Sequence, residues 1–226
     1  MPSVRRRSPA AISRLAEALY RRAPLRERTL ARLRPWICPF ELLLEVLPQR
    51  AQVLDIGCGS GMLLGLAASE GRIAVGVGID ASARAIATAQ AMAAEMPGAD
   101  LRFACLRAED PWPSGPFTVI ALIDVMHHVA PAHQDALVAR ACQAVPPGGL
   151  LVYKDMARRP RWRALANRLH DLVMARQWIH YLPFERVIAQ ARAQGLTLLR
   201  RQATACGCYQ HELAVLGRVA AAAAPP

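Results

Sequence analysis

The chain has a single lysine, Lys154, although it carries 28 basic residues against 17 acidic ones. Its net charge of +11 therefore comes almost entirely from arginine, and the excess lies at one end. Residues 1–34 hold ten arginines against Glu17 and Glu27, whereas the rest of the chain is nearly balanced. Because the excess is local, the charge alone does not predict a nucleic-acid-binding protein.

Other absences narrow the class of protein further. None of the six cysteines belongs to a C-x-x-C pair and no histidine stands at zinc-ligand spacing, so we expect no metal site and the reduced thiols of a cytoplasmic protein. No apolar run approaches the ~18 residues that indicate a membrane span. Arg14 and Glu17 interrupt any secretory signal. The length of 226 residues suits one α/β domain with additions.

A glycine-rich turn follows the first apolar run of the central chain. The segment VLDIGCGSG places Asp55 before three glycines at alternate positions, Gly57, Gly59 and Gly61, and an apolar helical pattern follows. This order predicts a strand, a tight turn and a helix N-terminus that a ligand can approach closely. A dinucleotide loop would have glycine where this chain has Met62, and a carboxylate would repel a pyrophosphate. The loop therefore favours a nucleotide that carries a cationic group, although an ordinary strand-to-helix turn would explain the glycines alone.

A second acid ends the next apolar run. Asp80 follows residues 73–79 and comes 19 residues after Gly61. In α/β nucleotide folds an acid at this place binds the ribose, because a carboxylate can accept two hydrogen bonds from a vicinal diol. The acid does not by itself distinguish one ribose-bearing cofactor from another.

Four segments together resemble the class I S-adenosylmethionine (SAM)-dependent methyltransferases, in particular the small-molecule and quinone-type members. Residues 53–61 resemble motif I of that family, and GIDAS at 78–82 resembles motif II. DVMHHV at 124–129 resembles the D-V-L-H-H-I that follows strand 4, and PPGGLL at 146–151 resembles the turn into strand 5. The resemblance covers roughly residues 50–217 and implies SAM as the cofactor.

The resemblance also implies which residues hold the cofactor. They are Asp55, Gly57, Gly59, Gly61, Asp80, Ala81, Ala108, Glu109 and Asp124. The chain departs from the family at Arg107, which stands where an acid is expected on the adenine edge. Arginine has no acceptor for the adenine amino group, so Glu109 or Asp110 would have to supply one.

Proton removal from the methyl acceptor would fall to His127 or His128, which follow strand 4 beside the expected methyl position. An imidazole has a pKa suited to a general base, and we expect only one of the two rings to point inward. The alternative is that both histidines only begin a helix. Asp155 is a further candidate, and an acceptor that ionises easily needs no base.

Residues 157–182 interleave arginines with tryptophan and tyrosine, and we interpret them as a lid over the acceptor. The candidate acceptor contacts are His180 and Tyr181 in this lid and Tyr209 in a loop at 206–211 of the last hairpin.

The alternating apolar runs predict a Rossmann-like α/β fold with a seven-stranded, mostly parallel sheet, helices on both faces and an antiparallel last strand. The strands are expected at residues 52–56, 73–80, 101–105, 117–123, 150–155, 196–201 and 212–217. Residues 1–48 are expected to form a basic helical cap, 49–218 the methyltransferase domain and 219–226 a disordered tail.

These observations predict transfer of the SAM methyl group to an oxygen or carbon of a small aromatic, lipid-like or carrier-bound metabolite. The basic N-terminus would suit an acidic carrier protein or a membrane surface, which would make the protein peripheral there. Two alternatives stay open: an RNA methyltransferase, and a SAM-binding protein without activity. The absence of a D/N-P-P-Y/F motif after strand 4 argues against methylation of nucleobase amino groups.

Overall fold

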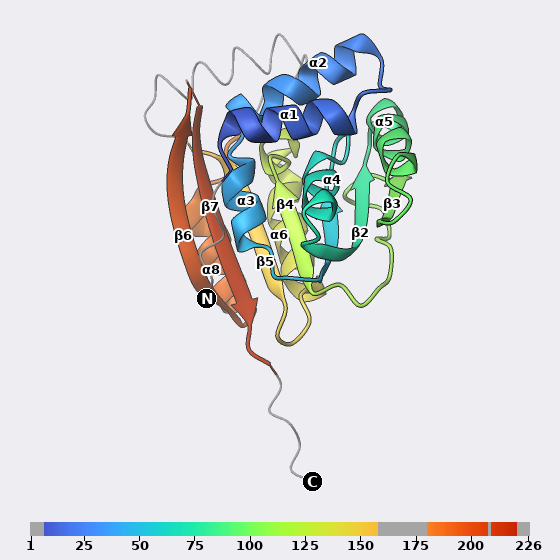
Figure 1. Ribbon diagram of the computed structural model, residues 1–226. Coiled ribbons are helices and arrows are strands. Elements are labelled where there is room, and N and C mark those ends of the chain that lie inside the picture. Colours follow the sequence, from blue (N-terminus) through green and yellow to red (C-terminus); the bar gives the residue numbers. More distant parts are fainter. Residues whose placement is uncertain (1–6, 158–179, 208, 221–226) are drawn as a thin grey trace.

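The computed structural model describes residues 7–157, 180–207 and 209–220 (Figure 1). At its centre lies a seven-stranded sheet with the order β3-β2-β1-β4-β5-β7-β6. The strands are β1 Ala51–Ile56, β2 Ile73–Asp80, β3 Asp100–Cys105, β4 Val119–Ile123, β5 Leu150–Met156, β6 Leu196–Cys206 and β7 Tyr209–Arg218. The pairs among β1 to β5 are parallel, and β7 is antiparallel to both β5 and β6. The predicted fold class is confirmed.

From β1, the strands β2 and β3 extend the sheet toward one edge, whereas β4 and β5 extend it toward the other. The strand order therefore reverses between β1 and β4, which pair in the middle of the sheet. The helices after β1 and β4 therefore leave toward opposite faces. In open α/β sheets this reversal opens a crevice at the carboxyl ends of the strands. The topology thus marks one edge of the sheet as the place for a ligand.

Helices cover both faces of the sheet (Figure 1). They are α1 Pro9–Leu19, α2 Leu25–Leu33, α3 Phe40–Val46, α4 Met62–Ser69, α5 Ala83–Ala94, α6 Pro131–Ala144 and α8 Phe184–Ala193, with short 3-10 helices η1 Arg34–Trp36 and η2 Met126–His128. Alternate residues of β1 enter two apolar layers: Val53 packs with α1, α3, α4 and α5, whereas Leu54 packs with α6 and α8. Burial on both faces explains why the central strands are continuous apolar runs.

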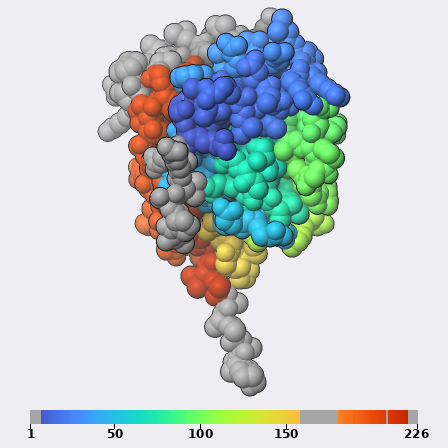
Figure 2. Space-filling view, viewed as in Figure 1, coloured from blue at the N-terminus to red at the C-terminus, as the bar shows by residue number. Residues whose placement is uncertain are grey.

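The N-terminal helices α1 and α2 lie across the carboxyl edge of the sheet (Figures 1 and 2). Ile12 and Ala16 of α1 are fully buried against the domain. Tyr20, directly after α1, donates a hydrogen bond from its hydroxyl to the carbonyl of Ser60 at 2.7 Å. The first helix is therefore tied to the glycine turn.

The final hairpin differs from the prediction. β6 runs to Cys206 and β7 begins at Tyr209, so the expected loop at 206–211 is wrong and most of it is strand. β6 is an edge strand whose residues alternate between half-buried and exposed, and Gln202 to Cys206 carry a weak apolar signal. Their backbone nevertheless pairs with β7, down to Cys206 opposite Tyr209. β4 also begins two residues later than predicted, at Val119.

Most of the predicted lid, residues 158–179, and residues 221–226 of the predicted tail lie outside the described residues. Among the helices that are described, none combines the length and the apolar character needed to cross a membrane.

Candidate active site

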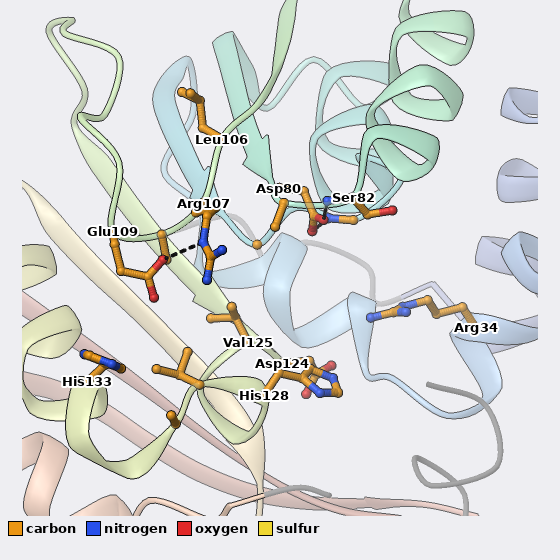
Figure 3. Close-up of a pocket in the computed structure, with 16 residues that line it drawn as sticks. Arg34, Asp80, Ser82, Leu106, Arg107, Glu109, Asp124, Val125, His128 and His133 are labelled. Atoms are coloured by element: carbon orange, nitrogen blue, oxygen red, sulfur yellow. Dashed lines mark hydrogen bonds and ion pairs between the residues drawn. The ribbon is translucent and has the colours of Figure 1, made fainter. Parts of the chain in front are cut away.

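An open cleft of about 980 Å³ lies at the carboxyl edge of the sheet, beside the point where the strand order reverses (Figure 3). Seven of the predicted cofactor residues line it: Gly57, Gly59, Asp80, Ala81, Ala108, Glu109 and Asp124. They come from the turns after β1, β2, β3 and β4. Residues that the sequence predicts for the cofactor thus lie together on the wall of one cleft.

The glycine turn needs glycine for two reasons. Gly57 has φ +75°, and a Cβ there would come within 2.5 Å of Cγ2 of Val125. Gly61 has φ +79° and begins α4, where a Cβ would lie 2.7 Å from the ring of Phe103. Positive φ and close packing both exclude a side chain. Gly61 does not line the cleft, so it shapes the turn rather than its surface.

Asp80 presents a carboxylate that the backbone holds in place. The amide of Gly59 donates to Oδ2 at 2.9 Å, and the amide of Ser82 donates to Oδ1 at 2.8 Å (Figure 3). Each carboxylate oxygen can accept more than one hydrogen bond. Asp80 can therefore still accept two hydroxyl groups from a ligand in the cleft.

Asp55 lies deeper, beside a small cavity of about 40 Å³ that Gly57 and Ser60 also line. Its side chain is buried, and Oδ1 has no hydrogen-bond partner among the described residues. Burial, and then the negative charge of Asp80, raise the pKa of Asp55 to about 7. A buried acid in this state is suited to a ligand that brings a positive charge.

Arg34 is a site residue that sequence reasoning missed. It belongs to η1, and its guanidinium points into the cleft (Figure 3). It lines the cleft, the cavity beside Asp55, and a third cavity of about 90 Å³. In the sequence nothing separates it from the other N-terminal arginines. Its place follows from the fold of α1 and α2 over the sheet edge.

The two histidines of η2 point to different spaces. His128 lines the cleft, whereas His127 is buried and lines only the third cavity, which His128 and Tyr209 also border. Nδ1 of His127 lies 2.5 Å from Oδ1 of Asp155, and the backbone amide of His127 donates to Oδ2 at 3.2 Å. The third cavity therefore faces an imidazole that is oriented by a carboxylate.

Asp124 leaves β4 in a left-handed conformation, with φ +54°. Burial would raise its pKa, but the positive groups around it, foremost Lys154, together outweigh burial and hold this pKa well below its usual range. Burial would likewise lower the pKa of Lys154, but Asp124 together with Cys38 and Asp155 outweighs that effect, so the pKa of Lys154 is raised. Asp124, His127 and Asp155 offer ligand atoms within 4.8 Å of one another, the spacing that a metal ion requires. The ammonium group of Lys154 already pairs with the carboxylate of Asp124, in the place where a metal ion would supply the positive charge.

Comparison with known proteins adds to this geometry. A family model described as a methyltransferase domain matches residues 25–201. The chain belongs to this family.

Among curated proteins, the ubiquinone biosynthesis O-methyltransferase of Neisseria meningitidis serogroup A is 32% identical over 135 residues, which are 58% of this chain and 53% of that protein. The chain thus spans about half the length of the curated relatives that it matches.

Two solved structures illustrate the shared fold. Magnesium protoporphyrin IX methyltransferase from Synechocystis, with bound SAH, has a TM-score of 0.63 at 17% identity and covers 80% of this chain and 81% of its own. The cyclopropane synthase of Mycobacterium tuberculosis has a TM-score of 0.64 at 20% identity and covers 80% and 83%. The predicted membership in the class I methyltransferases is confirmed.

The turn after β3 is where this methyltransferase chain departs from its family. The side chain of Arg107 is mostly exposed, and its Nε lies 3.5 Å from the carboxylate of Glu109. Asp110 accepts a hydrogen bond from the amide of Arg107 at 2.8 Å, so its carboxylate serves the turn. Arg140 donates to three carbonyls of the turn, including that of Ala108 at 3.0 Å. Of the two acids that the sequence offered, Glu109 is the one that lines the cleft.

Two predicted acceptor contacts lie beside the undescribed segment. The amide of His180 donates to the carbonyl of His127, and Gln134 donates to the carbonyl of His180, both at 2.8 Å. His180 and Tyr181 line none of the three cavities. Their contact with an acceptor stays a prediction, whereas Tyr209 borders the third cavity.

Proposed function

We propose that the protein transfers the methyl group of SAM to a hydroxyl oxygen of a small, lipid-like phenolic acceptor. The observation that carries the proposal is the pair of acids beside the glycine turn, at the ends of β1 and β2. Asp80 offers two fixed oxygens to the cleft, and Asp55 lies buried with an unpartnered oxygen among the described residues. A ribose diol and an ammonium group are the chemical complements of these two carboxylates.

The residues present fit SAM as the cofactor. Asp80 would accept the ribose hydroxyls, and Asp55 with Gly57 and Gly59 would hold the aminocarboxypropyl end. Arg34, which borders both spaces, would pair with the carboxylate of that end. Bound SAM supplies a methyl group on a cationic sulfur.

The other predicted cofactor residues would meet the adenosine part. Ala81, Ala108 and Glu109 form the wall beyond Asp80, where adenine would lie, and Glu109 would supply the acceptor that Arg107 lacks. Asp124 would border the cofactor from the far side while its carboxylate stays with Lys154.

The third cavity is the proposed acceptor site. Tyr209 and Met156 would contact the acceptor ring, and His127 would take the proton of the hydroxyl as a general base. Asp155 orients the imidazole and would stabilise its protonated form. His128 lies between the acceptor cavity and the cleft, where it would exclude water.

The names of the curated relatives support an oxygen as the methylated atom, because they are O-methyltransferases of ubiquinone biosynthesis. The ubiquinone in these names is the reason to propose a lipid-like phenol. We also propose that the acceptor reaches the site from a membrane surface or an acidic carrier protein, since the arginine-rich segment of α1 and α2 lies across the carboxyl edge of the sheet (Figure 1).

Calorimetric titration with S-adenosylhomocysteine tests the cofactor, with NAD as the negative control. We expect micromolar binding that is lost in Asp80→Ala and retained in Asp100→Ala, which removes an exposed acid at the start of β3. Absence of binding to the unaltered chain would overturn the proposal. Transfer of an isotope-labelled methyl group to a catechol, with the methyl ether identified by mass spectrometry, then tests the acceptor class. A product methylated on carbon would contradict an oxygen acceptor.

A further inference from the structure

Four of the six large exposed apolar side chains among the described residues lie in α2 and η1. Leu25 is 78% exposed, Leu33 50% and Trp36 52%, and Leu30 is also exposed. Ala31 is the one buried residue of α2. We call Leu25, Leu30, Leu33 and Trp36 the α2 patch. Among the described residues, the large exposed apolar side chains elsewhere are Leu199 and Val219.

The three leucines of the patch lie on one half of α2, which they share with the exposed Arg26 and Thr29. Leu25 and Leu33 are eight positions apart, a little over two helical turns, and Leu30 lies on the same half of the helix. Trp36 follows in η1. Both views place α2 at the outer border of the molecule, on the side away from the sheet (Figures 1 and 2). The patch therefore projects as a ridge and does not form a groove.

Arginines flank this ridge. The side chains of Arg22, Arg26 and Arg32 are 72%, 59% and 60% exposed. Residues 20–36 contain six arginines against one acid, Glu27. Three acids pair with these arginines: Glu95 with Arg21 and Arg22, Glu17 with Arg28 and Arg32, and Glu27 with Arg26. The six arginines still outnumber these acids two to one. The surface around the patch therefore attracts an anionic partner.

We propose that the α2 patch docks on an anionic lipid bilayer. Leucine and tryptophan on one side of a helix, with arginine beside them, are the composition of a helix that lies in a membrane interface. A projecting apolar ridge can insert between lipid headgroups without a shaped receptor. An acidic protein would complement the arginines, but it would need a matching groove for Leu25 and Leu33.

Docking would also place the cleft beside the lipid. Arg34 directly follows Leu33 and precedes Trp36, and its guanidinium points into the cleft (Figure 3). Leu33 and Trp36, which flank the cleft residue Arg34 in the sequence, thus both belong to the α2 patch. A lipid-like acceptor would have a short path from the bilayer to the site. That consequence rests on the proposed function, whereas the docking itself does not.

Flotation of the full chain with lipid vesicles tests the proposal. We expect the chain to float with vesicles of phosphatidylcholine and phosphatidylglycerol, and much less with phosphatidylcholine alone. The double variant Leu25→Glu/Leu33→Glu should bind anionic vesicles at least about tenfold more weakly. Leu199→Glu is the matched control, because it places the same charge on an exposed leucine of β6. It should bind as the unaltered chain does.

Binding of S-adenosylhomocysteine, measured on the same samples, shows that the double variant is folded and separates the two proposals. Failure of the unaltered chain to bind anionic vesicles would overturn docking, as would equal binding by the double variant. A purified acidic acyl carrier protein that binds where vesicles do not would replace the bilayer with a protein partner. Vesicle binding without adenosylhomocysteine binding would overturn the proposed function and leave the docking intact.

Discussion

The ammonium group of Lys154 lies 2.7 and 2.6 Å from the two carboxylate oxygens of Asp124. Lys154 lies in β5 and Asp124 directly follows β4, the adjacent parallel strand, and the amide of Asp124 donates to the carbonyl of Lys154 at 2.9 Å. This double connection holds Asp124 at a positive φ, which residues other than glycine rarely adopt. The chain's only lysine thus fixes the turn that carries His127 and His128.

Removal of the lysine charge should destabilise the protein strongly. In Lys154→Met the carboxylate of Asp124 stays buried without its partner, and we expect the free energy of unfolding to fall by about 3–5 kcal/mol. Asp124→Asn should also be costly, because it leaves the ammonium unpaired. Urea denaturation measures both values.

The double variant Lys154→Met/Asp124→Asn should recover at least about half of the summed loss, since neither charge is then left alone. The exposed pair of Arg102 and Asp100 is the matched control, and its disruption should cost about 1 kcal/mol or less. If the loss of unfolding free energy in the double variant equalled the sum of the losses in the two single variants, that result would contradict the pairing of Lys154 with Asp124.

Asp55 links stability to cofactor binding. Its ordinary pKa is near 3.8 and its pKa in the folded protein is about 7, so between these values the folded state binds more protons than the unfolded state. Its contribution to stability is therefore full below about pH 4 and is lost as the pH rises through about 7. Asp55→Asn stays neutral throughout. We expect it to be more stable than the unaltered chain at pH 8 by roughly 1–3 kcal/mol.

The same substitution should abolish binding of SAM, because the ammonium group loses its anionic partner. Urea denaturation at pH 4 and pH 8, with calorimetry at pH 8, measures the two effects together. Asp100→Asn, at an exposed acid, should change neither. If Asp55→Asn were less stable than the unaltered chain at pH 8, the charged form of Asp55 would not be destabilising in the folded state, which would contradict the raised pKa.

The parallel sheet explains why much of the site could be predicted. Asp55, Asp80, Asp124 and Asp155 each end or follow an apolar run that reads as a strand. Parallel strands bring their carboxyl ends to one edge, so acids that are far apart in the sequence meet there. Once the strands are recognised in the sequence, the four acids are expected at the carboxyl edge of the sheet.

The remaining features depend on contacts that no local pattern encodes. Arg34 enters the site through the fold of α1 and α2 over the sheet edge, and it looks like its neighbours in sequence. Lys154 reads as a charge inside an apolar strand, and its partner Asp124 lies 30 residues earlier. The final hairpin was predicted with strands that are too short, because an edge strand needs backbone pairing more than an apolar pattern.

Gly57→Ala should damage the cofactor site. The new Cβ would meet Val125 at 2.5 Å in a backbone with φ +75°. We expect a destabilisation of about 2–3 kcal/mol and at least about tenfold weaker binding of adenosylhomocysteine. Gly71→Ala is the matched control, because Gly71 has φ +65° with nothing within 4 Å of its Cβ position. It should cost about 1 kcal/mol and leave binding unchanged. If Gly71→Ala weakened adenosylhomocysteine binding as much as Gly57→Ala, that result would contradict a specific role for Gly57.

His127 should control the rate of methyl transfer without holding the cofactor. His127→Gln should lower kcat by about 10²- to 10⁴-fold while binding of adenosylhomocysteine stays as it was. Asp155→Asn should lower kcat less and should shift the pH profile, because Asp155 acts through the imidazole. His128→Gln is the comparison, since its ring borders both spaces and the 2.5 Å contact with Asp155 belongs to His127.

A series of phenols with falling pKa values separates a general base from a structural histidine. A phenol that is already ionised needs no base, so the deficit of His127→Gln should shrink as the acceptor becomes more acidic. If His127 only shaped the turn, every acceptor would lose the same factor. A constant deficit across the series would therefore assign His127 to the architecture of the site and leave the chemistry to the cofactor and the acceptor.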